Sequence, residues 1–166
     1  MKRNKKSGFT LVEMLCTIII LLLVTLGVVT GVQLAMRSYA KSVSNSEAQV
    51  LCATLTSSVS DKLRSSGKVN VDTTPITFFC PEIGNNASFS QNEKGQVLLG
   101  DMKLLPARAY PYGMRAQVEI EGFDSSTNIF TVSVTVTDAT GKKLSGNEFQ
   151  VEVLNPNQYD DSTVEP

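Results

Sequence analysis

The chain has 166 residues, of which 42% are hydrophobic and 19% are charged, and it contains three Cys and no His. This length suits one domain of ordinary size, and the apolar fraction is too high for a disordered chain. Cys is too sparse for a disulfide scaffold. The lack of His excludes Ser–His–Asp and Cys–His catalysis and most zinc sites, so we expect no enzyme, no metal and no cofactor.

Positive charge gathers at the N-terminus. The first eight residues hold four of the 15 basic residues and no acid, which leaves 11 basic and 16 acidic residues, a formal charge of −5, for the remainder. We therefore expect residues 1–8 to form a basic leader. The negative remainder argues against strong electrostatic binding of nucleic acid.

An apolar run from Phe9 to Val32 follows the leader, and Glu13 is its only charge. As a helix of 24 residues it would extend about 36 Å, enough to cross a hydrocarbon core of about 30 Å. Because basic residues precede this run, we expect a single-pass membrane protein with a cytoplasmic N-terminus and its C-terminal domain outside. A cleaved secretory signal peptide is the alternative, although the run is long for one and the cleavage candidates near Ala35 and Ala40 fit poorly.

Glu13 places a carboxylate within this apolar run. A charged side chain costs about 2.5–3.5 kcal/mol near the centre of a bilayer and less near the interface. Either Glu13 reaches the cytoplasmic headgroups, or it pairs with a cation that another chain supplies within the membrane.

The segment from Lys5 to Leu15 reads KKSGFTLVEML. It closely resembles the class III signal of type IV prepilins and pseudopilins, in which a short basic leader ends in Gly, Phe follows, and Glu is the fifth residue after the Gly. Gly8, Phe9 and Glu13 match these positions without a shift. Beyond the apolar run the resemblance is architectural only.

The resemblance implies both processing and assembly. A prepilin peptidase would cut between Gly8 and Phe9 and methylate the new amino group of Phe9. Glu13 would then neutralise the Phe9 ammonium of a neighbouring subunit, because pairing offsets the cost of two isolated charges in lipid.

A chain of this family would be a structural subunit, major or minor, of a type IV pilus or of a type II secretion or competence pseudopilus. Its partners would be the peptidase, the membrane and other pilin or pseudopilin subunits in a homo- or hetero-polymer at the cell surface. The alternative is an uncleaved, membrane-anchored extracytoplasmic binding module, which would not need Gly8, Phe9 or Glu13.

The chain lacks the helix-breaking Pro that many pilins carry midway through the span. Gly27 and Gly31 occupy that region, and each weakens a helix by about 1 kcal/mol. They would soften the helix, form a small-residue contact between spans, or play no special part.

Residues 33–66 change to an amphipathic pattern. The apolar positions recur at helical spacing: Met36, Tyr39, Val43, then Leu51, Leu55, Val59 and Leu63. Ser65-Ser66-Gly67 supplies a stop, with Gly67 suited to the position just past a helix end. We therefore expect one helix from Phe9 to Ser66.

Residues 67–155 follow a period of two, which is typical of strands. Short strands are expected at 69–71 and 76–78, an irregular segment at 80–114 with a candidate strand at 96–99, and longer antiparallel strands at 116–121, 130–137 and 149–153, joined by turns at 124–127 and 138–141. Their apolar face should lie on the Leu51–Leu63 stripe. The fold class is α+β and pilin-like: a long N-terminal helix packed on a small antiparallel sheet.

Cys52 falls near the helical stripe and Cys80 ends an expected strand. A Cys52–Cys80 disulfide and two buried thiols both remain open. We expect residues 156–166 to form an acidic, flexible tail.

Overall fold

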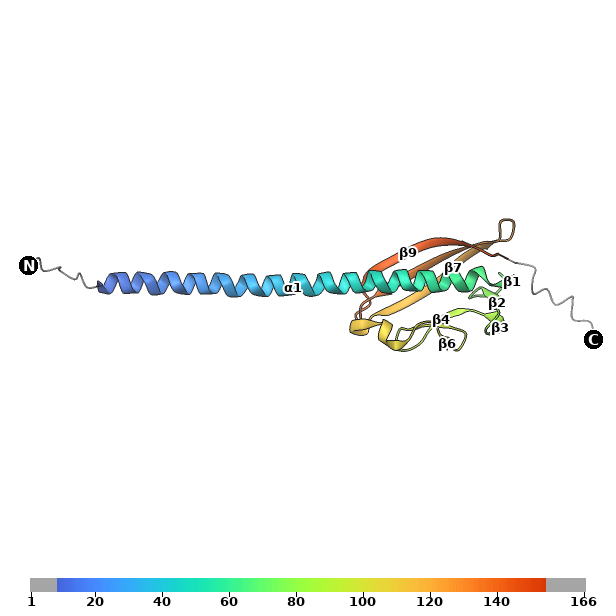
Figure 1. The fold of residues 1–166 in the computed structure, drawn as a ribbon, viewed down its shortest axis with the longest axis horizontal. Helices are drawn as coiled ribbons and strands as arrows, with labels where there is room; N and C mark the ends of the chain where they lie inside the picture. Colours follow the sequence, from blue (N-terminus) through green and yellow to red (C-terminus); the bar gives the residue numbers. More distant parts are fainter. Residues whose placement is uncertain (1–8, 155–166) are drawn as a thin grey trace, which may run out of the picture. The chain divides into compact units, whose positions relative to one another are not determined.

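The computed structural model describes residues 9–154, so the expected leader and tail lie outside the described residues. The chain divides after Val43 into two compact units. Helix α1 (Leu11–Arg64) contributes to both, and the strands belong to the second unit (Figure 1). The predicted single helix is confirmed to within two residues at each end.

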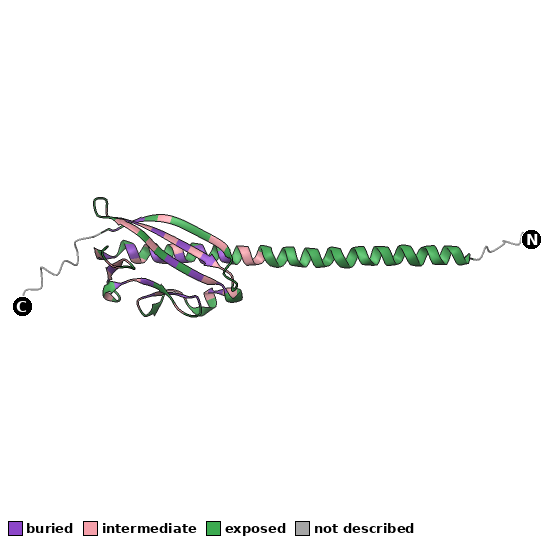
Figure 2. Cartoon of the chain, turned by 180° about the vertical axis from the view of Figure 1, so that it is seen from behind, coloured by how far each residue is buried: buried purple, intermediate pink, exposed green. Residues whose placement is uncertain are grey.

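The first unit is the part of α1 that ends at Val43. Its apolar side chains are exposed on every side of the helix as far as Tyr39, and Val43 is half-buried (Figure 2). The Thr17, Thr25 and Thr30 hydroxyls donate hydrogen bonds of 2.8, 2.7 and 3.0 Å to carbonyls three or four residues earlier in the helix. These polar groups are thus satisfied within the helix, as an apolar environment requires.

The second unit begins with residues 44–64 of α1, and this part of the helix buries one face. The buried residues recur at spacings of three and four: Ala48, Leu51, Cys52, Leu55, Val59 and Leu63. The predicted stripe is confirmed from Leu51 onward. Met36 and Tyr39, which continue the helical spacing toward the N-terminus, are exposed.

The largest sheet is an antiparallel meander of β7 (Arg115–Asp124), β8 (Ile129–Thr137) and β9 (Lys143–Glu152), in that order. It confirms the three predicted strands, although β9 begins earlier than predicted. On β8 the buried side chains Phe130, Val132, Val134 and Val136 alternate with half-buried Thr and Ser. One face of this sheet therefore serves the core.

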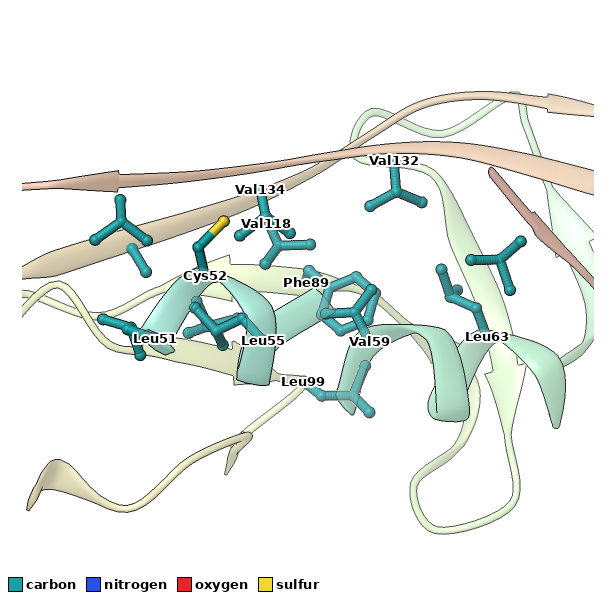
Figure 3. Packing of buried hydrophobic residues seen from close by; sticks show 14 of the residues in the cluster. Leu51, Cys52, Leu55, Val59, Leu63, Phe89, Leu99, Val118, Val132 and Val134 are labelled. Carbon is teal, nitrogen blue, oxygen red and sulfur yellow. The ribbon is translucent and has the colours of Figure 1, made fainter. Parts of the chain in front are cut away.

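The core forms where the α1 stripe meets the inner face of this sheet. Leu55, Val59 and Leu63 are fully buried there with Val132 and Val134 (Figure 3). An aromatic cluster extends the core: the Phe130 ring centroid lies 6.0 Å from that of Phe78 and 4.6 Å from that of Phe123. The predicted packing of the sheet on the stripe is confirmed.

Two smaller sheets precede the meander. One contains β1 (Gly67–Asn70), β2 (Thr77–Cys80) and β3 (Gly84–Ala87), and the other contains β4 (Phe89–Gln91), β5 (Val97–Leu99) and β6 (Met102–Lys103). The 3-10 helices η1 (Ala107–Ala109) and η2 (Pro111–Gly113) lead into β7. The expectation of an irregular segment at 80–114 was wrong except for the strand near residues 96–99.

The end of α1 differs from the predicted glycine stop. The helix ends at Arg64, and buried Ser66 turns the chain by donating from its hydroxyl to the Leu63 carbonyl at 2.6 Å. Gly67 starts β1, and the positive φ in this turn, 32°, is found at the next residue, Lys68. A side-chain hydrogen bond thus replaces the glycine conformation that the sequence indicated.

Each turn of the meander is held by an aspartate. The Asp124 carboxylate accepts from the Ser126 hydroxyl at 2.6 Å, and the Asp138 carboxylate accepts from the Thr140 hydroxyl at 2.6 Å. These hydrogen bonds hold the pKa of both carboxyls below the usual value. Because the folded pKa is the lower one, any stabilisation from these turns is present above the unfolded pKa and is lost as the pH falls through the folded pKa.

Tyr110→Phe is expected to lower the free energy of unfolding by about 1–3 kcal/mol. The reason is that the Tyr110 hydroxyl accepts the buried Val97 N–H at 3.1 Å, and phenylalanine would leave that donor unpaired. Urea unfolding of the detergent-solubilised full chain measures the difference. Tyr112→Phe is the matched control, since Tyr112 is exposed, and an equal loss from both changes would contradict this assignment.

Candidate functional site

The first turn of α1 is closed by Thr10 and Glu13. The Glu13 N–H donates to the Thr10 hydroxyl oxygen at 3.3 Å, and the Thr10 N–H donates to Glu13 Oε2 at 3.4 Å. This reciprocal arrangement is a capping box, in which the N-cap residue and the third helical residue satisfy each other's backbone donors. Both side chains are exposed, and the contacts are long for hydrogen bonds.

The capping box gives Glu13 a function that the sequence analysis missed. Its carboxylate lies at the positive end of the helix dipole and binds a free backbone donor of its own chain. The signal was present in the sequence, because Thr10-Leu11-Val12-Glu13 fits the Thr-x-x-Glu pattern of a capping box. In the structure, Glu13 therefore forms hydrogen bonds with the first turn of its own helix.

Phe9 and Thr10 precede the first helical residue, and Gly8 lies outside the described residues. The Phe9 side chain is exposed. Phe9 is therefore separated from Glu13 by the first turn of α1. The structure brings Thr10 and Glu13 together, and the roles of Gly8, Phe9 and Glu13 in processing and assembly stay predictions.

Helix α1 is the segment of residues 9–154 that is long and apolar enough to cross a membrane. Its most apolar stretch has no buried residue within residues 9–154, which is consistent with membrane anchoring. Gly27 and Gly31 lie four residues apart, and nothing lies within 4 Å of a Cβ built at either one. Both glycines are therefore accessible to a neighbouring helix. The three alternatives for them, which are softening of the helix, a contact between spans or no special part, stay predictions.

Cys52 and Cys80, the candidate disulfide pair, are both buried and carry free thiols in the structure. Cys52 lies on α1 within the buried cluster that Figure 3 shows. The choice between a disulfide and two thiols stays a prediction; as thiols, both would behave as small apolar side chains of the core.

Reduction is accordingly expected to leave the electrophoretic mobility of the denatured chain unchanged. In a Cys16→Ser background, a thiol reagent should label the chain only after unfolding, because Cys52 and Cys80 are both buried. A faster band without reductant that disappears with reductant would show a disulfide instead.

Among residues 9–154, no three His, Cys, Asp or Glu side chains are grouped so as to hold a metal ion. A hollow of about 340 Å³ lies beside β7. Its lining combines apolar residues with Gln91, Gln117, Glu119 and Glu121.

The N-terminal region matches a known family of sequences. Residues 3–29 match the prokaryotic N-terminal methylation motif, which is the class III signal motif of type IV prepilins. The match includes Gly8, Phe9 and Glu13 and the apolar run as far as residue 29. Searches with the chain found no match among curated proteins and none among solved structures.

Proposed function

We propose that this prepilin-type precursor is a structural subunit of a type IV pilus or a related pseudopilus. The observation that carries the proposal is the position of the methylation motif, which covers the start of an exposed, apolar α1. A chain that is only anchored needs an apolar helix. It does not need Gly, Phe and Glu in this register.

Processing would begin at the bond between Gly8 and Phe9. A prepilin peptidase on the cytoplasmic side would remove residues 1–8, including the basic cluster, and methylate the Phe9 amino group. The first helical hydrogen bond runs from the Met14 N–H to the Thr10 carbonyl at 3.2 Å, so it lies beyond the Gly8–Phe9 bond that would be cleaved.

Assembly would then use the membrane half of α1. The Phe9 ammonium is a charge in an apolar setting, and Glu13 of a neighbouring subunit is the acid of opposite charge in the run. The second unit would lie outside the membrane, because the basic leader favours a cytoplasmic N-terminus.

Gly8→Val is expected to block processing, because the peptidase site would have to accept a branched side chain at the cleaved bond. The full chain is expressed in a host with its own prepilin peptidase, and the mass of the extracted protein reports the leader. Ser7→Val, one residue earlier, is the matched control and should still be cleaved. Normal cleavage of Gly8→Val would contradict the assignment of this bond.

A further inference from the structure

Strand β9 runs in the same direction as the α1 segment beside it. Asn147 Nδ2 lies 3.5 Å from Thr56 Oγ1, and the Leu154 N–H donates to the Arg64 carbonyl at 3.1 Å. The start of β9 therefore lies toward the end of this unit where α1 enters it, and the finish of β9 lies where α1 ends.

One end of the β7–β8–β9 sheet is basic. The register places Arg115 and Lys143 on either side of Thr137, and Lys142 immediately precedes β9. Both lysines are exposed. This basic corner lies where β9 starts.

Farther along the same strands the charges are acidic. The register places Glu119 and Glu148 on either side of Ser133, and both glutamates are exposed. The ion pair found among residues 9–154 joins Lys62 to Glu82, so the lysines and glutamates of this sheet form no ion pair there. Glu119 accepts a hydrogen bond of 2.7 Å from the neutral Gln117 amide. A sheet with unpaired charges of opposite sign at different places can complement a second copy of itself.

The acidic part of β7 borders the hollow of about 340 Å³. Glu119 and Glu121 line it from β7, while Phe89 and Ile76 line it from the neighbouring segments. Ile120 pairs with a β8 residue and so does Gly122, which leaves Glu121 as the extra residue of a bulge. Bulges re-aim side chains and interrupt pairing, and this one lies at the acidic wall of the hollow.

The basic corner is held by a well-ordered turn. The Asp138 N–H donates to the Lys142 carbonyl at 2.9 Å, and the Lys142 N–H donates to Asp138 Oδ1 at 3.0 Å. The backbone that carries the two lysines is thus fixed before any partner arrives. A fixed backbone lowers the entropy lost on docking.

We propose that Lys142 and Lys143 of one copy dock against Glu119 and Glu121 in the hollow of the next copy. The inference rests on the proposed function as a filament subunit. A second copy is the partner because this chain presents both complementary surfaces, whereas an anionic lipid surface would leave the glutamates unmatched. Since the two surfaces are different patches of one chain, the contact is heterologous and can repeat into an open filament.

Cysteine cross-linking of the full chain in cells tests this contact. A chain with Cys16→Ser, Glu121→Cys and Lys143→Cys is expected to give a ladder of dimers, trimers and larger species on mild oxidation. The ladder arises because each copy would join one neighbour through each thiol. Chains with only one of the two introduced cysteines are the controls and should give no ladder.

Charge reversal provides the second test. Lys142→Glu with Lys143→Glu, or Glu119→Lys with Glu121→Lys, is expected to reduce pelleted filaments about tenfold, because attraction becomes repulsion at two pairs. The chain that carries all four reversals should regain assembly, since complementarity is restored. Failure of this rescue would contradict the pairing.

The outcomes separate this contact from the function on which it rests. Filaments of the double-cysteine chain that pellet normally without a ladder would overturn the contact and leave the proposed function intact. If neither the double-cysteine chain nor the unaltered chain forms filaments, and no ladder appears, the contact and the proposed function are both overturned. A band that joins the Lys143→Cys chain to a different protein, identified by mass spectrometry, would overturn the assignment to a second copy.

Discussion

Glu13→Gln is expected to leave membrane insertion intact and to reduce filament assembly more than tenfold. Glutamine is neutral, so the Phe9 ammonium of the neighbouring subunit would lose its counter-charge within the membrane. An unpaired charge costs up to about 3 kcal/mol in the membrane, the full cost applying near the bilayer centre, and about 1.4 kcal/mol corresponds to a factor of ten. Sedimentation of sheared filaments measures assembly, and alkaline extraction of membranes measures insertion.

The capping box makes Glu13→Gln the informative substitution. Glutamine can still donate and accept in a capping box, so this change removes the charge and keeps the cap. Thr10→Val is the matched control, since it removes the hydroxyl that Glu13 N–H reaches and keeps the carboxylate. Normal assembly of Glu13→Gln, together with loss of assembly in Thr10→Val, would assign Glu13 to the cap and contradict the ion pair between subunits.

Leu55→Ala is expected to destabilise the second unit by about 2–5 kcal/mol. Leu55 is fully buried where α1 meets the sheet, and alanine would leave a cavity that the surrounding strands cannot close. Urea unfolding of the detergent-solubilised chain, followed by a probe in the β domain, measures the loss.

Val50→Ala on the same helix is the control for Leu55→Ala. Val50 is 63% exposed, so its truncation should change the stability by no more than about 0.5 kcal/mol. Similar losses from Leu55→Ala and Val50→Ala would contradict the packing of the α1 stripe on the sheet.

The sequence predicted the parts of the fold in which a periodic pattern is long. The α1 stripe from Leu51 to Leu63 and the alternation on β8 each repeat several times, so local spacing alone identifies the buried face. The turns at Asp124 and Asp138 were also predicted, because their side chains bond to nearby backbone and hydroxyl groups.

In the small sheets between residues 67 and 103, the strands expected at 69–71, 76–78 and 96–99 correspond to β1, β2 and β5, whereas β3, β4 and β6 were missed. Strands such as β4 and β6 have three and two residues, too few for a period to be recognised. Their positions depend on contacts between distant residues, including a hydrogen bond of 2.9 Å from Gln91 Nε2 to the Ala116 carbonyl. The helix ends directly before the predicted Ser65-Ser66-Gly67 stop, but the part assigned to Gly67 was wrong, because Ser66 closes the turn through its own hydroxyl.

The candidate site was predicted unevenly. The motif around Gly8, Phe9 and Glu13 was recognised from residue types in register, and residues 3–29 match the methylation motif. The capping box was missed although Thr10 and Glu13 have the required spacing, because a carboxylate within an apolar run pointed to headgroups or to an ion pair and not to the helix start. The charge pattern of β7 and β9 needed the strand register, which a sequence does not supply.

The intact mass of the protein extracted from membranes of cells with their own prepilin peptidase tests the central claim most directly. We predict the mass of the chain without Met1–Gly8 and with one added methyl group. Retention of the full leader would contradict processing and favour an uncleaved, membrane-anchored module. Cleavage near Ala35 or Ala40 would make the chain a secreted domain and would contradict the part proposed for Glu13.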